Sequence, residues 1–203
     1  MPRTDRVTID LAKAAAVVRD GGIVAYPTET VYGLGVDATQ SAAVRALCRL
    51  KRRDLGKGLS VLVGEDADLE RWTGGTPTPA LRIAARFWPG PVTLVIPVRT
   101  GILSAVVTEL GVGFRCSSHP QAAALARAAA GPLVSTSCNL SGEPPCRSSE
   151  EVVRRFGEGL PVIEGETDGG APSTVIAVSA DGEVSLLREG ALPFDRILME
   201  VRA

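Results

Sequence analysis

The sequence predicts a single-domain α/β fold. Short apolar runs bounded by glycine or proline alternate with stretches whose apolar residues recur at helical spacing, a pattern typical of a sheet flanked by helices. The chain has 203 residues, 45% hydrophobic and 22% charged, as in ordinary globular proteins. A chain of this length buries roughly 70% of the surface that its unfolded form exposes, so its core needs no disulfide or metal. With no internal repeat and no long linker, one domain is expected over residues 1–203.

The first part of the chain predicts two helices and two strands. Residues 10–20 are alanine-rich, have apolar positions at helical spacing and are followed by two glycines, which predicts a helix. The apolar run 23–26 before Pro27 predicts a buried strand. Residues 41–51 gather alanine and leucine on one helical face, and the apolar run 59–63 predicts the next strand.

The rest of the chain continues the alternation. Helical patterns at 66–72 and 79–88 end at a Pro-Gly-Pro break, and residues 92–98 then predict a third strand. Two further helices and five further strands follow: helices at 121–130 and 150–157, and strands at 112–116, at 132–137 and near residues 160, 174 and 184. Because the late strands follow one another closely, the sheet is expected to be mixed.

Composition argues against several classes of protein. The four cysteines form no CxxC pair and there is one histidine, so no structural zinc is expected. The net charge of −1 and the pI of about 5.9 contrast with the pI above ~9 that is typical of nucleic-acid-binding domains. No apolar run approaches the ~18 residues of a membrane helix, and the first residues lack the apolar core of a signal peptide. We therefore expect a cytoplasmic protein that does not enter a membrane.

Polar segments follow the predicted strands, at the positions where open α/β sheets place ligands. Residues 26–35, YPTETVYGLG, combine hydroxyl groups, Glu29 and glycines, and taken alone an ordinary turn explains them. Residues 132–142, PLVSTSCNLSG, place Ser135, Ser137 and Asn139 on one face of an extended chain. Three buried polar groups without partners would cost about 1–3 kcal/mol each, so the protein or a ligand must bind them.

Two basic segments have both a structural and a functional interpretation. In KRRDLGK, residues 51–57, Lys51 and Arg53 can reach one anion only if the chain leaves the helix between them, whereas cations at the end of a helix also simply complement its dipole. In VGFRCSSHP, Arg115 either extends along a sheet edge or binds a carboxylate or phosphate. His119 before Pro120 has the pattern of a helix-entry residue.

One common motif is matched only in letters. GLGVDA, residues 33–38, fits the dinucleotide pattern G-x-G-x-x-A, but it lacks both a preceding strand in direct contact and the acidic residue expected about 20 positions later. We do not interpret it as a nucleotide site.

Together these segments resemble the YrdC family of L-threonylcarbamoyladenylate synthases. The resemblance covers about residues 15–191 and rests on motifs in a fixed order: GGIVAYPTETVYGLG, LKRRDLGKGLSVLV, FWPGPVTLVIP, VGFRCSSHP, PLVSTSCNLSGEPPCRS, PSTVI and LREG. It implies one YrdC-like domain with a core of about 8–191, a twisted mixed sheet flanked by helices, and a large basic concave cavity. The implied activity joins L-threonine, bicarbonate or CO2, and ATP into threonylcarbamoyl-AMP and pyrophosphate. That product serves the threonylcarbamoyladenosine modification of tRNA, through a tRNA-modifying transferase complex that accepts the adenylate.

The resemblance also implies roles for individual residues. The catalytic groups around the ATP phosphates would be the KxR and SxN residues, which are Lys51, Arg53, Ser137 and Asn139. Lys57 and Arg188 would be further nucleotide contacts. The threonine ligands would be Thr30, Arg115, Ser135 and Ser173. ATP would act as substrate with Mg²⁺, and no protein metal site is implied.

The sequence departs from the family pattern at three positions. Asp54 and Gly58 replace a proline and a Lys-Pro-Leu stretch near the KxR pair, which leaves the role of Lys57 open. Cys138 replaces the alanine that is common inside SxN.

The implied chemistry is compatible with a chain that has one histidine. A threonine carbamate is already an anion, so its attack on the α-phosphorus needs no histidine base. The main obstacle is the approach of two anions, which cations at the phosphates and Mg²⁺ would offset. Arg115 would hold the threonine carboxylate with two parallel hydrogen bonds.

Two alternatives remain from the sequence. The first is a module that binds tRNA or double-stranded RNA without catalysis, against which stand the net charge and the 4% of aromatic residues. The second keeps the fold but transfers carbamoyl groups, as in hydrogenase-maturation proteins, whose zinc-binding cysteine pairs this chain lacks. Oligomeric state and selectivity for threonine over serine are not indicated by the sequence.

Overall fold

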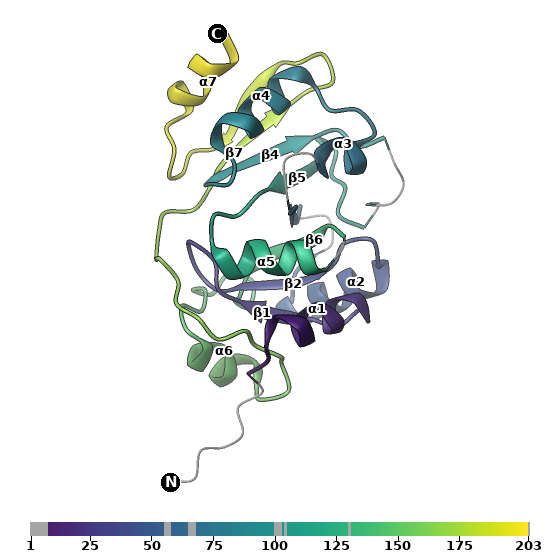
Figure 1. The fold of residues 1–203 in the computed structure, drawn as a ribbon, viewed down its shortest axis with the longest axis vertical. Coiled ribbons are helices and arrows are strands. Elements are labelled where there is room, and N and C mark those ends of the chain that lie inside the picture. The colour runs from purple at the N-terminus through teal and green to yellow at the C-terminus, as the bar shows by residue number, and fades with distance from the viewer. Residues whose placement is uncertain are drawn as a thin grey trace.

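A mixed sheet of eight strands forms the centre of the molecule (Figure 1). The structure is a computed structural model and describes residues 8–54, 58–64, 68–99, 103, 105–129 and 131–202. The strand order across the sheet is β1-β2-β6-β3-β5-β4-β7-β8. The strands are β1 (Val24–Tyr26), β2 (Gly33–Asp37), β3 (Ser60–Leu62), β4 (Val92–Ile96), β5 (Val112–Arg115), β6 (Leu133–Ser137), β7 (Thr174–Val178) and β8 (Val184–Arg188).

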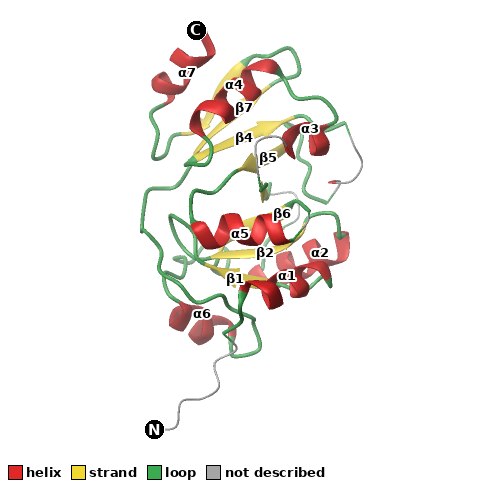
Figure 2. Ribbon diagram, in the orientation of Figure 1, coloured by secondary structure: helices red, strands yellow, loops and turns green. Residues whose placement is uncertain are grey.

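Helices cover both faces of this sheet (Figure 2). They are α1 (Leu11–Arg19), α2 (Ser41–Lys51), α3 (Asp68–Thr73), α4 (Thr78–Phe87), α5 (Pro120–Ala128), α6 (Ser149–Phe156) and α7 (Phe194–Arg202). Helices α1 and α5 lie side by side on one face, and α7 packs along α4. Among the described helices, none is both long and apolar enough to span a membrane.

Two apolar cores follow from the alternation of side chains along the strands. Val24 and Tyr26 of β1 point toward α1 and α5, whereas Ala25 between them joins the larger core on the opposite face. In β3, Val61 and Leu62 divide in the same way. Because successive side chains of a strand point to opposite faces, continuous apolar runs are needed where both faces are buried, as the sequence pattern indicated.

The α/β class and the mixed sheet are confirmed, and most predicted elements form within a few residues of their expected bounds. The main strand that the sequence analysis missed is β2, whose GLGVD sequence looked like a glycine turn. Its glycines serve a packing role: a Cβ on Gly35 would lie 2.8 Å from the ring of Tyr26, and one on Gly33 would lie 3.1 Å from it. The segment is therefore a strand beneath an aromatic ring and not a nucleotide-binding turn.

Two other predictions differ from the structure. The strand expected near residue 160 is reduced to isolated bridges from Val162 to Thr8 and Ala25. Helix α7 was not predicted, because the core was expected to end near residue 191. It is anchored by the buried Ile197 and by an ion pair of 3.1 Å between Arg86 and Glu200.

The turn before β5 requires glycine at position 111. Gly111 has φ +117°, and a Cβ there would lie 2.1 Å from the carbonyl oxygen of Ile96. We expect Gly111→Ala to lower the free energy of unfolding by roughly 2–6 kcal/mol, because it adds backbone strain to a steric clash. Gly142→Ala is the matched control, since Gly142 has φ +88° but nothing within 4 Å of its Cβ position. Urea unfolding that gave equal losses for both variants would contradict the clash.

Candidate functional site

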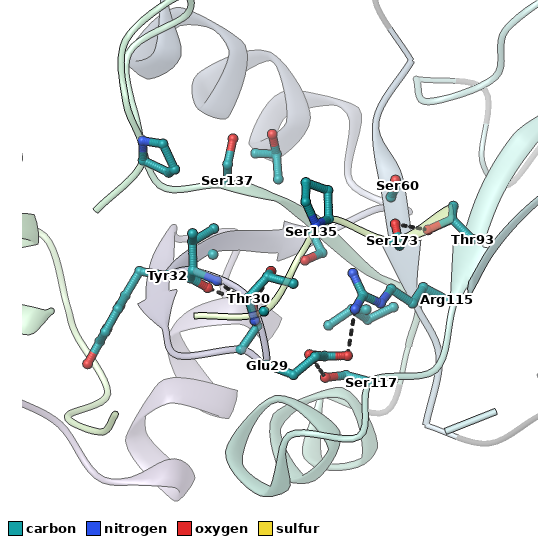
Figure 3. Close-up of a pocket in the computed structure, with 18 of the residues that line it drawn as sticks. Glu29, Thr30, Tyr32, Ser60, Thr93, Arg115, Ser117, Ser135, Ser137 and Ser173 are labelled. Carbon is teal, nitrogen blue, oxygen red and sulfur yellow. Dashed lines mark hydrogen bonds and ion pairs between the residues drawn. The ribbon is translucent and has the colours of Figure 1, made fainter. Parts of the chain in front are cut away.

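A cavity of about 540 Å³ opens over the central strands of the sheet, on the face that carries α1 and α5 (Figure 3). Hydroxyl groups, glycines and arginines dominate its wall. Among the described residues, the charged ones that line it are four arginines and one glutamate: Arg53, Arg115, Arg147, Arg188 and Glu29. An excess of guanidinium groups over carboxylates suits this cavity to an anionic ligand.

The sheet register places small polar side chains on the floor of this cavity. Ser60 of β3 lies opposite Ser135 of β6, and Ser60 also lies beside Gly113 of β5. Thr93 of β4 shares a hydrogen bond of 2.8 Å with Ser173, which directly precedes β7. Side chains that would normally be apolar on a buried sheet are thus replaced by hydroxyls where the helices leave the sheet uncovered.

Tyr26 fixes the direction of Ser135. The Tyr26 hydroxyl donates to Ser135 Oγ at 2.8 Å, and the tyrosine ring is fully buried above the two glycines of β2. Burial raises the pKa of Tyr26 far above its ordinary value, so the phenol keeps its proton and remains a donor. Ser135 consequently has its own hydroxyl proton free to donate into the cavity.

An ion pair joins the loop after β1 to the end of β5. Arg115 Nη2 donates to Glu29 Oε1 at 2.6 Å, while Ser117 Oγ donates to Glu29 Oε2 at 2.6 Å (Figure 3). Burial opposes ionisation of Glu29, but the charge of Arg115 and the Ser117 hydroxyl outweigh it and lower the pKa of Glu29 below its ordinary value. The Nε atom of Arg115 is buried, and no described residue accepts a hydrogen bond from it.

The loop that carries Glu29 is held by its own threonines. Thr28 Oγ1 donates to the carbonyl of Val31 at 2.6 Å and accepts the backbone N–H groups of Thr30 and Val31. Thr28 is buried, whereas Thr30 lines the cavity. The self-bonded turn that the sequence suggested is therefore present, and it presents Thr30 and Glu29 to the cavity.

Lys51 is buried at the end of α2 and is directed away from solvent. Lys51 is only 2% exposed. Its Nζ donates to the carbonyl oxygens of Ser137 and Asn139, and also to Asn139 Oδ1 at 3.0 Å. An ammonium group has three donors, so these three acceptors take all of them. Burial lowers the pKa of Lys51 to about 8.

The chain leaves the helix directly after Lys51, as convergence of the KxR pair required. Arg52 has φ +51°, the left-handed conformation that non-glycine residues adopt infrequently. Arg53 then lines the cavity, and its Nη2 donates to the carbonyl of Gly58 at 3.0 Å. Lys51 and Arg53 therefore act at different places: Lys51 under the loop after β6, and Arg53 at the cavity wall.

The loop after β6 likewise carries one predicted site residue at the cavity wall, Ser137, and one behind the wall, Asn139. Ser137 lines the cavity and donates from Oγ to Asn139 Oδ1 at 2.7 Å. Asn139 Nδ2 donates in turn to the carbonyl of Glu143. Asn139 thus connects Ser137 to Lys51 and closes its own loop, and its side chain is occupied by the protein.

A strap, residues 164–172, borders the far side of the cavity. Tyr32 donates its hydroxyl to the carbonyl of Gly165 at 2.7 Å, and a ring nitrogen of His119 lies 3.0 Å from the carbonyl oxygen of Glu166. His119 is the N-cap of α5, the structural role expected for it. Beyond the strap, Arg188 Nη2 donates to the carbonyl of Ser173 at 2.9 Å.

Most of the predicted site residues meet at the cavity, and they come from six separate segments. Those that line it are Thr30, Arg53, Arg115, Ser135, Ser137, Ser173 and Arg188. Lys51 and Asn139 lie behind the wall in the network just described, and Lys57 lies outside the described residues.

Several residues of the wall were not predicted. Glu29 lies in the segment YPTETVYGLG, but the sequence predicted no binding or catalytic role for it, nor for Ser117, Thr93 or Arg147. Ser117 lies two residues after Arg115, so the extended chain there could have indicated a shared direction. Arg147 lies at the end of the segment PLVSTSCNLSGEPPCRS, but only the fold shows that it reaches the cavity.

The wall offers little for a metal ion. Within the described ranges, no group of three histidine, cysteine, aspartate or glutamate side chains could hold one. The carboxylate of Glu29 is already bound by Arg115 and Ser117. A divalent cation that accompanies a phosphate ligand would therefore take its oxygens from the phosphates and from water.

Comparison with known proteins decides the family. The family model for Sua5, YciO and YrdC proteins, which carries the description telomere recombination, matches residues 16–190. The chain belongs to this family. It is 41% identical over 180 residues to the threonylcarbamoyl-AMP synthase of Stenotrophomonas maltophilia, covering 87% of this chain and 97% of that protein. It is also 41% identical over 186 residues to the threonylcarbamoyl-AMP synthase of Escherichia coli, covering 89% of this chain and 95% of that one.

Solved structures of the Sua5/YciO/YrdC family share the fold. P. abyssi Sua5 complexed with L-threonine is 34% identical with a TM-score of 0.83; the match covers 94% of this chain but 56% of that one. E. coli YciO is 27% identical with a TM-score of 0.77, covering 90% of each chain. Full-length HypF, at 20% identity and a TM-score of 0.72, shares the fold over 91% of this chain and 29% of its own length.

The Glu29–Arg115 pair predicts a pH-dependent contribution to stability. We expect Glu29→Gln to lower the free energy of unfolding at pH 7 by roughly 3 kcal/mol, the lower end for a broken buried ion pair. A lowered carboxyl pKa stabilises the folded state above the ordinary glutamate value and loses that effect as the pH falls through the folded pKa. Urea unfolding at neutral and at acid pH should therefore show the difference between wild type and variant shrinking in acid. A difference that stays constant would contradict the ion pair.

Lys51 predicts a titration in the loop after β6. Below a pH of about 8 the ammonium has three donors, and above it the neutral amine has two, so one contact to Ser137 or Asn139 is lost. The side-chain amide signals of Asn139 in NMR spectra should therefore shift with a midpoint near pH 8. Lys51→Met should abolish that titration, whereas Cys146→Ala should retain it and so exclude the nearby thiol as its source. An unchanged midpoint in Lys51→Met would contradict the assignment.

Proposed function

We propose that this protein is an enzyme that makes L-threonylcarbamoyl-AMP and pyrophosphate from L-threonine, bicarbonate or CO2, and ATP. The observation that carries the proposal is the cavity, where arginines suited to a carboxylate and to phosphates surround one floor of hydroxyl groups. Support also comes from relatives named threonylcarbamoyl-AMP synthase and from a related structure complexed with L-threonine. The product would serve the threonylcarbamoyladenosine modification of tRNA.

Threonine would bind at the end of the cavity formed by β5 and the loop after β1. One guanidinium nitrogen of Arg115 is occupied by Glu29, which fixes the plane of the group and leaves its other nitrogens to hold the threonine carboxylate. Thr30 and Ser135 provide hydroxyls beside it, and Ser173 provides one across the floor. Tyr26 orients Ser135 so that its proton faces the ligand.

The ATP phosphates would bind between α2 and the loop after β6. Arg53 supplies the cation on the wall, and Ser137 supplies a hydroxyl, with Arg188 on the nucleotide from β8. Lys51 and Asn139 would act indirectly, by holding this loop in place, because the three donors of Lys51 are bound to its carbonyl and amide oxygens. ATP would enter as its Mg²⁺ complex, with the metal ligated by phosphate oxygens and water.

The reaction follows from this arrangement. Threonine carbamate, formed when the neutral amine takes up CO2 and loses a proton, is the nucleophile. Its oxygen forms a bond to the α-phosphorus of ATP, the bond from that phosphorus to the bridging oxygen breaks, and pyrophosphate leaves with the electron pair. The residues of this chain would hold the two anions in line and offset their repulsion, with Arg115 at one end and Arg53 at the other.

An RNA-binding module is the second candidate. The arginines of the wall give it some support, but the chain has a net charge of −1 and so no overall attraction to a polyanion. Binding to tRNA that fell steeply with salt, in protein that released no pyrophosphate, would favour it over the enzyme.

Pyrophosphate release tests the enzyme directly. With ATP, Mg²⁺ and bicarbonate, we expect release that depends on L-threonine. Arg53→Ala should lower the rate ~10²- to 10³-fold, because one preorganised cation at the phosphates is lost. Arg82→Ala is the matched control and should retain the rate, because Arg82 is exposed on α4 beside α7 and does not line the cavity. Release that is indifferent to the amino acid would contradict the proposal.

Arg115 should affect threonine more than ATP. Arg115→Lys keeps the charge but cannot form two parallel hydrogen bonds to a carboxylate. We expect the KM for threonine to rise about tenfold or more, with the KM for ATP nearly unchanged, in initial-rate measurements. An equal rise in both KM values would place Arg115 at the nucleotide instead.

A further inference from the structure

The exposed side of α2 carries arginines that have no hydrogen-bond or ion-pair partner in the part of the chain that the structure describes. A shallow hollow of about 370 Å³ lies there, lined by Arg45, Cys48, Arg49, Arg52, Arg53 and Asp54. Arg45, Arg49 and Arg52 are exposed. Among the described residues, no hydrogen bond or ion pair engages their guanidinium groups.

Their spacing places them in one stripe. Arg45 and Arg49 are four residues apart on α2, so they lie on the same side of the helix. With a rise of 1.5 Å per residue, they are about 6 Å apart along the helix axis. Arg52, the left-handed residue that caps the C-terminus of α2, lines the same hollow. Like charges four residues apart destabilise a helix, so Arg45 and Arg49 oppose each other unless a counter-ion lies near them.

The helix dipole does not explain the stripe. Cations in the last turn of a helix are favoured, which accounts for Arg49, and Arg52 caps the same end, but Arg45 lies more than a turn earlier. Helix α6 of the same chain shows the ordinary alternative, because Glu150 and Glu151 there precede Arg154 and Arg155 by four residues. Helix α2 has no acidic residue at all.

The stripe lies next to the cavity. Arg53 lines both the hollow and the cavity, so the two surfaces meet at that residue. A molecule bound along α2 would therefore lie beside the cavity wall.

We propose that the stripe of Arg45, Arg49 and Arg52 is a docking surface for an acidic helix of a partner protein. Carboxylates spaced by four and three residues on such a helix would meet the three guanidinium groups, each able to form two parallel hydrogen bonds. The partner is the class of enzyme that consumes the reactive acyl-adenylate, an assignment that rests on the proposed function. A nucleic-acid duplex fits less well, because the stripe offers three cations whereas duplex binding commonly uses about 6–10 phosphate contacts.

The test uses two labelled peptides of equal composition. In the first, glutamates recur at positions i, i+4 and i+7 of an alanine- and glutamine-based helix, and in the second they are distributed around the helix. Fluorescence anisotropy should show that the full-length protein binds the first peptide more tightly, with an affinity that falls as salt is added. Arg45→Glu/Arg49→Glu should weaken that binding at least about tenfold.

The matched control is Arg127→Glu/Arg154→Glu, which changes the net charge equally on exposed positions of α5 and α6. It should leave peptide binding nearly unchanged. Equal losses in both variants, equal binding of the two peptides, or no binding would overturn the proposal. So would tighter binding of an RNA duplex that Arg45→Glu/Arg49→Glu abolishes.

Activity is measured in parallel. Arg45 and Arg49 do not line the cavity, so threonine-dependent pyrophosphate release should persist in Arg45→Glu/Arg49→Glu, and its loss would overturn the docking role. Absence of release in the wild type as well would count against the proposed function alone, because the peptide measurement does not depend on it.

Discussion

One buried ammonium group organises the polar side of this fold. Lys51 ends α2 beneath the loop after β6, where carbonyl and amide oxygens of Ser137 and Asn139 take its three donors. A buried charge is tolerated only when its hydrogen bonds are satisfied, so the helix end and the loop must keep one relative position. Ser141 N–H donates to the Lys51 carbonyl at 2.8 Å and adds a second tie. Arg53 and Ser137 reach the cavity wall from the two sides of this junction.

An ion pair plays the corresponding role at the other end of the cavity. Glu29 and Arg115 connect the loop after β1 with the end of β5, and the hydroxyl of Ser117 completes the hydrogen bonds of the carboxylate. The pair fixes the guanidinium plane while leaving donors for a ligand. The site is thus built from two rigid polar junctions with a floor of serine and threonine hydroxyls between them, and it requires no histidine.

The sequence predicted the elements whose pattern is local. Apolar runs between glycines and prolines correctly indicated strands such as β4 and β6, because a sheet buried on both faces requires them. Strand β2 was missed, since its glycines look like a turn and only the ring of Tyr26 above them explains their size. The motifs located the cavity through Arg53, Arg115 and Ser137, but spacing could not show that Lys51 turns under the loop. The partnership of Glu29 with Arg115 depends on strand order, which no local pattern contains.

The proposed function requires the cavity to carry out one reaction, and direct detection of its product is the most decisive measurement. The protein would be incubated with ATP, Mg²⁺, L-threonine and ¹³C-labelled bicarbonate, and the mixture examined at once by mass spectrometry. The account predicts threonylcarbamoyl-AMP that carries the label, formed together with pyrophosphate. Protein that is shown to be folded and yet forms no labelled adenylate, or forms AMP and pyrophosphate without the carbamoyl group, would contradict it.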